Sequence, residues 1–550
     1  MVALVGLSLA GPSVPVAAGP AATAPVKHPV AVGTGGAVVS DSAEATDAGL
    51  AVLRRGGTAS DAAVAVAATL GVTDPYVAGI GGGGYLVDYD ARTGRVSTID
   101  GRETAPARAD ARLFIDPSTN RPLPFATAVT SGLSVGVPGT LMTWREAVER
   151  WGRLSLAEDL RPAERIADAG FVVTATLREQ TRENVKRFAQ FSSTSALFLP
   201  GGRPPAVGSV LRNPDLAATY RQIAGEGVGA LYGGPIGRDV VRAVHDLPLA
   251  PGATLTPRPG LMALPDLERY AAPHRPPTRV EYRGYEVDGM APSSSGGITD
   301  GEALRILDTF DLARMTRVQV LHHYLEASRL AFADRNRYIG DSGYVDVSER
   351  RLLSRSFARA RACLIDPAHA SASPVPPGDV DADAGDCAPP QPAGTHRPDE
   401  GGSTNHLVVA DRWGDVASYT TTLEQTGGSG IVVPHRGFLL NNELTDFDVT
   451  PVQPGVPDPN LPAGGKRPRS SMSPTIVLSG GRPLLAVGSP GGATIITTVL
   501  QILVNRLDLG MNLEDAIAAP RASQRNAPRT QAEPAFLDLP ATRGLERLGH

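Results

Sequence analysis

The stretch Gly401-Gly402-Ser403-Thr404-Asn405-His406 closes a linker rich in Pro, Ala and Asp (363–403) and opens a run of β-type residues. A threonine at this point is a candidate nucleophile hidden within a precursor. Cleavage of the Ser403–Thr404 bond would give Thr404 a free α-amine, and such an amine can take the proton of the threonine's own hydroxyl. Alternatively, Thr404 only begins a strand. The residues downstream favour the first interpretation.

Two β-rich runs follow Thr404, namely 407–410 and 416–423, and the short loop between them contains Gly414. This pattern predicts a β-hairpin with Thr404 at the start of its first strand. Side chains alternate along a strand, so Thr420 and Thr422 would share one face of the second.

A second predicted hairpin, 475–487, leads through Gly488-Ser489-Pro490-Gly491-Gly492 into a helix expected over 493–507. Glycines before a helix N-terminus expose backbone N–H groups, which suits an oxyanion, although Gly-Gly at such a place also forms ordinary turns. An upstream hairpin, 85–90 with 95–100, would place Arg102 just past its end.

Helices are expected over two further regions. Residues 41–70 predict two helices broken by Gly56-Gly57, with N-cap candidates at Asp41-Ser42 and Ser60-Asp61. Residues 140–360 predict mainly helix, including 318–337. His322, His323 and Glu326 have metal-ligand spacing there, but roles on the helix surface or in the core account for them better, and we predict no metal.

Several separated motifs then recur in an order that resembles the γ-glutamyltransferase (γ-glutamyltranspeptidase) family of N-terminal nucleophile hydrolases, from about residue 30 to the end of the chain. The motifs are Asp61-Ala62-Ala63-Val64-Ala65-Val66, Gly79-Ile80-Gly81-Gly82-Gly83-Gly84, Gly101-Arg102-Glu103-Thr104-Ala105-Pro106 and Ser293-Ser294-Ser295-Gly296-Gly297. The resemblance implies an α+β fold, a four-layer αββα sandwich with two stacked antiparallel sheets between helical layers.

The resemblance also implies a role for each site residue. Thr404 would be the nucleophile and processing site, Thr422 would orient it, and Gly491 and Gly492 would supply the oxyanion N–H groups. The remaining residues would hold the amino-acid end of the substrate. Its α-carboxylate would be bound by Arg102, Ser470 and Ser471, and the planar guanidinium of Arg102 is well shaped for a carboxylate. Its α-ammonium would be bound by Glu443 and Asp446.

Two features depart from the better-known glutathione-cleaving members. Glu424 stands where they carry an asparagine that helps bind the amino group, and the form Glu424-Gln425-Thr426 is closer to the capsule poly-γ-glutamate depolymerase branch. The segment 450–465, where many members carry a lid, is short and has no aromatic residue. Both leave the identity of the substrate open.

The expected activity is therefore that of a γ-glutamyl hydrolase or transpeptidase. It would cleave itself before Thr404 and transfer the γ-glutamyl group of glutathione or related compounds through a threonyl ester, without a cofactor. A poly-γ-glutamate depolymerase and a β-lactam side-chain acylase share this chemistry. An unprocessed secreted binding protein is the alternative of another class.

Composition sets broader limits. With 42% hydrophobic residues, 61 Gly and 48 Pro, the chain is globular and rich in loops. A net charge of −5 with interspersed signs gives no reason to expect a nucleic-acid partner, and no apolar run past the N-terminus is long enough to span a membrane. The expected partners are small γ-glutamyl compounds and, after cleavage, the two pieces of one precursor.

The ends of the chain and its cysteines bear on location. Residues 1–24 are apolar and small, and Ala22-Thr23-Ala24 resembles a signal-peptidase site, although a basic first region is missing. We expect residues 1–24 to be a secretory signal rather than a flexible tail. Self-cleavage would then give a large subunit of residues 25–403 and a small subunit of residues 404–550. The expected location is secreted or in the cell envelope. The chain stops at His550 before the last strands typical of the family. Cys363 and Cys387 flank the linker and would be either a disulfide or two free thiols.

Overall fold

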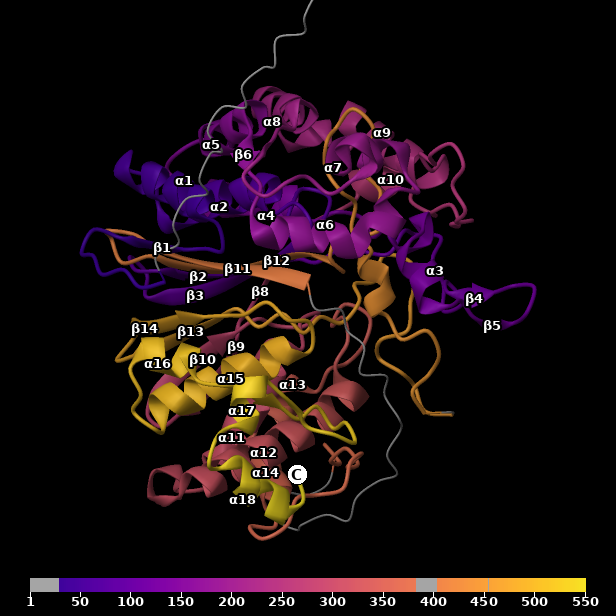
Figure 1. Ribbon diagram of the computed structural model, residues 1–550. Helices are drawn as coiled ribbons and strands as arrows, with labels where there is room; N and C mark the ends of the chain where they lie inside the picture. The colour runs from indigo at the N-terminus through magenta and orange to yellow at the C-terminus, as the bar shows by residue number, and fades with distance from the viewer. Residues whose placement is uncertain (1–28, 382–402, 454) are drawn as a thin grey trace, which may run out of the picture.

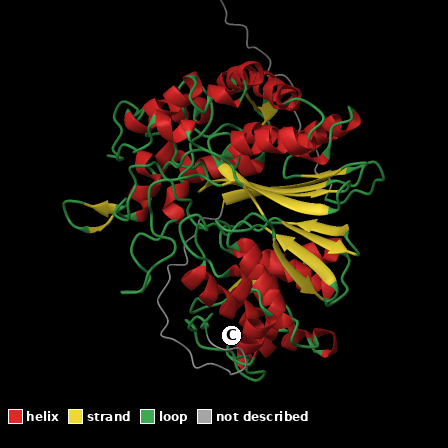
Figure 2. Ribbon diagram, turned by 180° about the vertical axis from the view of Figure 1, so that it is seen from behind, coloured by secondary structure: helices red, strands yellow, loops and turns green. Residues whose placement is uncertain are grey.

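The computed structural model describes residues 29–381, 403–453 and 455–550. Two antiparallel sheets face each other between two layers of helices (Figures 1 and 2), which confirms the expected four-layer αββα sandwich. The expected signal peptide and most of the linker lie outside the described residues. Among the described residues, no helix combines the length and the apolar character needed to cross a membrane.

The larger sheet has six strands and carries the hairpin that begins at Ser403. Its strand order is β1 (Ala37–Val39), β11 (Ser403–Ala410), β12 (Val416–Glu424), β2 (Gly83–Asp90), β3 (Arg95–Gly101) and β8 (His274–Arg275). Both hairpins predicted for this sheet, β11–β12 and β2–β3, are present within a few residues of their expected bounds, and they lie side by side because β12 pairs with β2. The sheet thereby brings the end of β3, and Arg102 after it, toward the start of β11.

The second sheet has four strands, in the order β14 (Arg482–Val487), β13 (Thr475–Ser479), β10 (Tyr285–Gly289) and β9 (Thr278–Tyr282). β13 and β14 form the predicted hairpin. Strands from both sides of the linker pair again here, since β10 pairs with β13. Two-stranded ribbons complete the strands: β4 (Ile115–Asp116) with β5 (Arg121–Pro122), β6 (Phe171–Val172) with β7 (Val210–Leu211), and β15 (Ala522–Ser523) with β16 (Gln531–Ala532).

One helical layer covers the outer face of the six-stranded sheet (Figure 1). It comprises α1 (Ala43–Arg54), α2 (Ala59–Thr73), α4 (Thr140–Trp151), α5 (Leu156–Ala169), α6 (Ala175–Phe188), α7 (Ser192–Phe198), α8 (Pro214–Glu226), α9 (Pro235–His245) and α10 (Leu264–Glu268), while α3 (Phe125–Val129) lies beside β4 and β5. Ser42 caps α1 as predicted. The cap expected at Ser60-Asp61 is wrong: Thr58 caps α2, and Asp61 closes the capping box from inside the helix.

The other helical layer covers the four-stranded sheet. It comprises α11 (Gly296–Leu307), α12 (Arg317–Tyr338), α13 (Glu349–Leu352), α14 (Arg355–Ala362), α15 (Thr494–Leu507), α16 (Leu513–Ala518), α17 (Pro534–Leu537) and α18 (Thr542–Leu548). α15 matches the helix predicted after the Gly-rich loop. Cys363, which follows α14, is disulfide-bonded, and Cys387, the other cysteine of the chain, lies outside the described residues.

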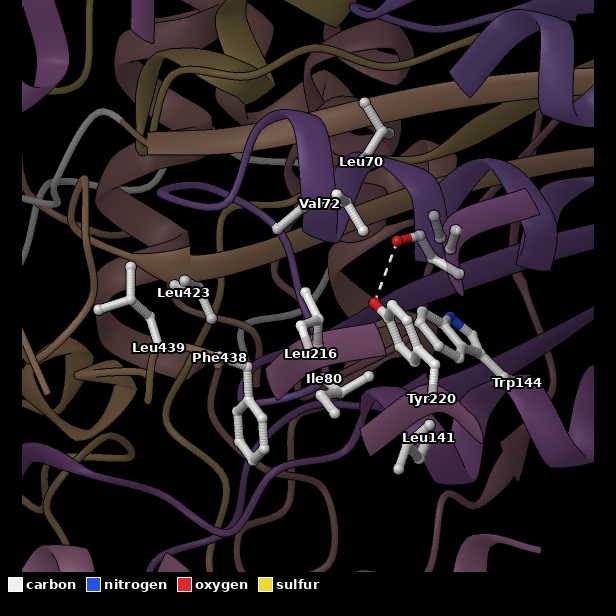
Figure 3. Close-up of a cluster of buried hydrophobic side chains, with 14 of the residues drawn as sticks. Leu70, Val72, Ile80, Leu141, Trp144, Leu216, Tyr220, Leu423, Phe438 and Leu439 are labelled. Carbon is white, nitrogen blue, oxygen red and sulfur yellow. Dashed lines mark hydrogen bonds between the residues drawn. The ribbon is translucent and has the colours of Figure 1, made fainter. Parts of the chain in front are cut away.

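The core between the first helical layer and its sheet is continuous and apolar. Every residue of α2 from Ala59 to Val72 is buried, because this Ala- and Val-rich helix lies between the sheet and the helices outside it. Figure 3 shows Leu70 and Val72 of α2 near side chains from α4, α8 and β12, among them Trp144, Tyr220 and Leu423. This packing anchors the β12 end that carries Thr422 and Glu424.

The Gly81–Gly84 run has a steric function. A Cβ on Gly81 would lie 2.0 Å from the Leu439 carbonyl oxygen, and one on Gly82 would lie 2.1 Å from the Thr422 carbonyl oxygen. Both contacts are impossible for a side chain, so glycine alone lets the backbones approach this closely. The sequence interpretation of a tight backbone approach near the site, rather than a phosphate loop, is consistent with this geometry.

Candidate active site

Thr404 lies in β11, one residue after that strand begins, and only 9% of its surface is exposed. Ser403 pairs with Glu424 and Asn405 pairs with Thr421, so Thr404 stands opposite two residues of β12, Thr422 and Leu423, and the register shifts at this point. A β-bulge interrupts the regular pairing of two strands and can re-aim the side chains next to it. The proposed scissile bond, between Ser403 and Thr404, therefore sits at an irregular point in an otherwise regular hairpin.

Thr422 contacts the Ser403–Thr404 peptide bond directly. Its hydroxyl accepts a hydrogen bond from the Glu424 N–H at 2.9 Å and donates one to the Ser403 carbonyl oxygen at 2.7 Å. The direction of the second bond is determined by chemistry, since a carbonyl oxygen can only accept. Thr422 thus holds the carbonyl that the Thr404 hydroxyl would attack during self-cleavage.

A small cavity opens beside Thr404. Its lining contains nearly all the residues predicted from the sequence: Arg102, Thr404, Thr422, Glu424, Glu443, Asp446, Ser470, Ser471 and Gly492, together with Met472 and Ile495. Gly491, the remaining predicted residue, precedes Gly492 but does not line the cavity. The predicted site residues therefore converge, although they come from both sides of the linker.

Arg102 is the buried cation of the cavity, with 1% of its side chain exposed. Its two terminal nitrogens pair with the carboxylates of Glu443 and Asp446. Its Nε donates to the Pro468 carbonyl at 3.2 Å. Burial opposes the charge, but the two carboxylates outweigh it and raise the pKa of Arg102 further above its usual value. The guanidinium therefore stays charged.

The two carboxylates come from one short 3-10 turn, Glu443–Asp446. The turn is anchored by Asn441, whose side chain accepts from the Glu443 N–H at 3.1 Å and donates to the Gly81 carbonyl at 2.7 Å. The Gly81–Gly84 run thus positions this turn as well as β12. Each carboxylate reaches Arg102 at the wall of the cavity.

Glu424 is the third acid of the cavity, with 5% exposure. Its carboxylate accepts from the side-chain amides of Asn442 and Gln425, the latter at 2.9 Å. Burial, followed by the charges of Asp446 and Glu443, raises the pKa of Glu424 well above its usual value. Its backbone has a positive φ of 78°, a region that Glu rarely adopts and Asn tolerates.

Ser470 and Ser471 lie on a loop held between two buried guanidinium groups. Arg102 donates to the carbonyls of Pro468 and Arg469 on one side. On the other side Arg335, from α12, donates to the Ser471 hydroxyl at 2.7 Å. Sequence reasoning missed Arg335, because nothing in the pattern of a long helix indicates which of its residues reaches a loop more than a hundred positions away.

Gly491 and Gly492 form the turn before α15. Both have positive φ, 132° and 56°, which a glycine adopts without strain. Their carbonyls accept hydrogen bonds from the first turn of α15, for example from the Ile495 N–H at 3.0 Å. The Gly492 position on the cavity wall, at a helix N-terminus, places it where an N–H can meet an oxyanion.

Glu103 is a further buried acid next to Arg102. It is fully buried, and neither of its carboxylate oxygens has a hydrogen-bond partner among the described residues. Burial raises the pKa of Glu103 to about 8, against the opposing effect of Arg102. This raised pKa favours the neutral form of Glu103 at neutral pH.

The helical residues with metal-ligand spacing serve other contacts. His322 bonds the Asp366 carbonyl and His550, each at 2.8 Å, and Glu326 pairs with Arg329 at 3.0 Å. Within the described ranges, no group of three or more histidine, cysteine, aspartate or glutamate side chains could hold a metal ion.

Comparisons with known proteins agree with this geometry. The sequence pattern described as Gamma-glutamyltranspeptidase matches residues 45–550. Over 464 residues the chain is 38% identical to the Glutathione hydrolase proenzyme of Bacillus subtilis (strain 168), covering 82% of this chain and 74% of that protein.

Two solved structures share the fold. The cephalosporin acylase from Bacillus halodurans superimposes with a TM-score of 0.81 at 27% identity, over 97% of this chain and 92% of that one. The Helicobacter pylori gamma-Glutamyltranspeptidase superimposes with a TM-score of 0.58 at 29% identity, over 63% of this chain and 95% of that one.

The fold has four layers, and a buried threonine lies near the start of a central strand with a polar cavity beside it. With the structural relatives, these features define an N-terminal nucleophile hydrolase. Within that class, the chain belongs to the γ-glutamyltranspeptidase family. It is an enzyme of the γ-glutamyltransferase type.

Proposed function

We propose that the protein cleaves itself before Thr404 and then transfers the γ-glutamyl group of glutathione or related compounds to water or an amino acid. The observation that carries this proposal is the Arg102 guanidinium, paired with Glu443 and Asp446 beside Thr404. An ion pair that faces a cavity offers a cation to a carboxylate and anions to an ammonium. The free α-amino-acid end of a γ-glutamyl substrate carries both groups on one carbon.

The chemistry follows from the geometry around Thr404. Its free α-amine, once formed, removes the hydroxyl proton as the oxygen attacks the γ-carbonyl carbon. The N–H of Gly492, with that of Gly491, stabilises the oxyanion. The amine of the substrate leaves with the proton, and a γ-glutamyl ester on Thr404 remains. Water or an amino acid then attacks this ester and releases the γ-glutamyl group.

A matched pair of amides tests the substrate class. Processed protein is assayed with γ-glutamyl anilide and with glutaryl anilide, which lacks only the α-amino group. Three acids placed for an ammonium should favour γ-glutamyl anilide by at least about 100-fold in kcat/KM, because sites built to bind a polar group reject analogues that lack it. Equal rates, or a preference for glutaryl anilide, would instead support a side-chain acylase, the class to which one structural relative belongs.

A second substrate class, γ-linked glutamyl oligomers, is favoured by one observation. Glu424 lines the cavity in place of the asparagine expected for glutathione-cleaving members, and no aromatic residue occurs in the segment 450–465 that follows the Glu443–Asp446 turn. A longer γ-linked chain could extend past such a segment. Glutathione and a γ-glutamyl oligomer, assayed side by side, distinguish the two preferences.

We further propose that residues 25–403 and 404–550 act as the two subunits of a processed heterodimer that is exported from the cell. The disulfide at Cys363 supports export, since disulfides persist in oxidising compartments. Fractionation of the producing cells, followed by detection of both fragments outside the cytoplasm, tests this location.

A further inference from the structure

Asn460 is a buried amide that the reaction described above does not use. It lies in the segment 450–465, between the Glu443–Asp446 turn (the acid turn) and the loop 468–471 (the serine loop). Only 1% of its surface is exposed, and it does not line the cavity beside Thr404. Its hydrogen bonds nevertheless connect it to the substrate site.

The Asn460 side chain joins two walls of the cavity. Its Nδ2 donates to the Asp446 carbonyl oxygen at 2.7 Å, and its Oδ1 accepts from the Arg469 N–H at 2.8 Å. These partners determine the orientation of the amide, since a carbonyl can only accept and a backbone N–H can only donate. The Asp446 carboxylate pairs with Arg102, and Arg469 directly precedes Ser470. One amide group therefore ties the acid turn to the serine loop.

The backbone around Asn460 is held as well as its side chain. The Asp448 N–H donates to the Asn460 carbonyl at 3.0 Å. Lys466 is 4% exposed, and its ammonium donates to the carbonyls of Pro459 and Leu461, each at 2.8 Å. A buried ammonium requires such acceptors. Because the two carbonyls flank Asn460, Lys466 holds this part of the segment against the two walls.

We propose that Asn460 is a positioning residue that sets the separation between the ammonium-binding and carboxylate-binding walls of the cavity. It acts through the Asp446 backbone on one side and the Arg469 backbone on the other. The segment 450–465 then serves as a brace between these walls. This inference rests on the proposed γ-glutamyl activity, and it adds to that activity a residue that favours substrates with a free α-amino-acid end.

Asn460→Asp separates the two contacts. A carboxylate can still accept from the Arg469 N–H, but it cannot donate to the Asp446 carbonyl, so two acceptors face each other. The acid turn should therefore shift while the serine loop keeps its contact. Asn526→Asp is the matched control. The Asn526 side chain bridges the N–H and the carbonyl of Val375 at 2.7 and 2.8 Å, outside the cavity, and loses the same donor.

Competitive inhibition of processed protein measures the effect, with γ-glutamyl anilide as substrate. The inhibitors are L-glutamate and glutarate, which lacks only the α-amino group. Asn460→Asp should raise the inhibition constant of L-glutamate roughly 10- to 100-fold, the cost of weakening a hydrogen bond to a charged group. The inhibition constant of glutarate and kcat should each change by less than about threefold. Asn526→Asp should match wild type, and all variants should cleave themselves at the wild-type rate.

Other outcomes separate the possible failures. If the inhibition constants of L-glutamate and glutarate rise by the same factor, if neither rises, or if kcat alone falls, the inference is overturned. Asn460→Ala removes both contacts and replaces the Asp variant if that protein does not fold; its loss for L-glutamate should again exceed its loss for glutarate. If neither variant cleaves itself, Asn460 only supports the fold and the inference is likewise overturned. If processed wild-type protein does not cleave γ-glutamyl anilide, the proposed function itself fails and takes the inference with it.

Discussion

The hydroxyl of Thr422 donates a 2.7 Å hydrogen bond to the carbonyl oxygen of Ser403, the residue immediately before the candidate nucleophile. In the uncleaved chain this carbonyl belongs to the bond that self-cleavage would break. A donor already on that oxygen is placed to stabilise the negative charge that develops when Thr404 attacks. We therefore expect Thr422 to act in self-cleavage, before the mature active site exists.

Thr422→Val, which removes the hydroxyl and keeps the shape, should slow self-cleavage by about 10²- to 10³-fold, the usual cost of losing one oxyanion donor. A time course on denaturing gels measures the rate. Thr422→Ser retains a hydroxyl and is the control. Processing of Thr422→Val at the wild-type rate would mean that the hydrogen bond to Ser403 plays no part in the reaction.

Thr404→Ala should abolish self-cleavage, because no hydroxyl remains to attack the Ser403 carbonyl. The variant should run as one chain of 57.2 kDa. Wild-type protein should give fragments of about 42 and about 15 kDa, in proportion to residues 1–403 and 404–550 of the 57.2 kDa chain. The larger fragment becomes smaller if a leader is removed. Two fragments from Thr404→Ala would show that another residue is the nucleophile.

Arg102→Lys should impair catalysis and spare self-cleavage. The lysine keeps a charge near Glu443 and Asp446, so the acids are not left unpaired, but it loses the fork that binds a carboxylate. Loss of such a contact should cost roughly 2–4 kcal/mol, or about 30- to 1000-fold in kcat/KM. Steady-state assays with γ-glutamyl anilide, normalised to the processed fraction on gels, measure this. An unchanged kcat/KM would remove Arg102 from the binding site.

Glu103 should make folding stability depend on pH. Its pKa of about 8 exceeds the value near 4.5 expected in the unfolded chain, so the native state holds a proton that the unfolded state releases between these two values. The stability contributed by the neutral carboxyl is complete below about pH 4.5 and is lost as pH rises toward 8.

Glu103→Gln keeps the neutral shape and removes this titration. Urea unfolding at pH 5 and pH 8 should show a smaller loss of unfolding free energy for the variant than for wild type. The difference should be on the order of several kcal/mol at most, since one pKa unit corresponds to about 1.4 kcal/mol. Parallel losses in the two proteins would indicate that Glu103 is ionised in the native state.

Glu424→Asn should change both stability and specificity. Asn tolerates the positive φ of 78° at this position better than Glu, so the unfolding free energy should rise by about 1 kcal/mol. Replacing the acid should also shift preference toward small γ-glutamyl compounds. In wild type we expect glutathione to be a modest substrate and γ-glutamyl oligomers to compete with it.

Competition assays with glutathione and a γ-glutamyl oligomer, on both proteins, check the specificity. Efficient cleavage of glutathione by wild type, with no turnover of oligomers, would refute the role assigned to Glu424 and leave an ordinary transpeptidase. Gln425→Ala is a useful control, because Gln425 bonds the Glu424 carboxylate but does not line the cavity.

Local patterns predicted much of this fold. The three hairpins follow from alternating β-type residues around short turns, and α15 follows from its apolar spacing after a Gly-rich loop. The pairing of one hairpin with another could not be predicted from local patterns. β12 pairs with β2 across more than three hundred residues, and the periodicity of neither strand indicates this pairing. The family resemblance supplied the sandwich that local patterns could not.

The site residues also divide into those that the sequence predicted and those that it did not. Residues in motifs, such as Arg102 and Ser471, were identified and do converge. Arg335 was missed, because its contact with Ser471 depends on the tertiary fold rather than on residue type. The cap at Thr58 was missed although the Thr58–Asp61 spacing of a capping box is present in the sequence. The sequence also did not predict the pairing of Arg102 with Glu443. Arg102 was assigned to the substrate α-carboxylate and Glu443 to its α-ammonium, and these separate roles do not imply that the two side chains touch.

The strand order predicts whether the two pieces would dissociate after the proposed cleavage. β11 and β12 of the C-terminal piece lie between β1 and β2 of the N-terminal piece, and β13 lies against β10 in the other sheet. After the proposed cleavage neither piece would retain an intact sheet of its own, so we expect the two pieces to stay together. Dilution should not dissociate them, and pieces produced separately should fail to assemble from preformed halves. The proposed cleavage would give the chain a new end without creating an interface that can open.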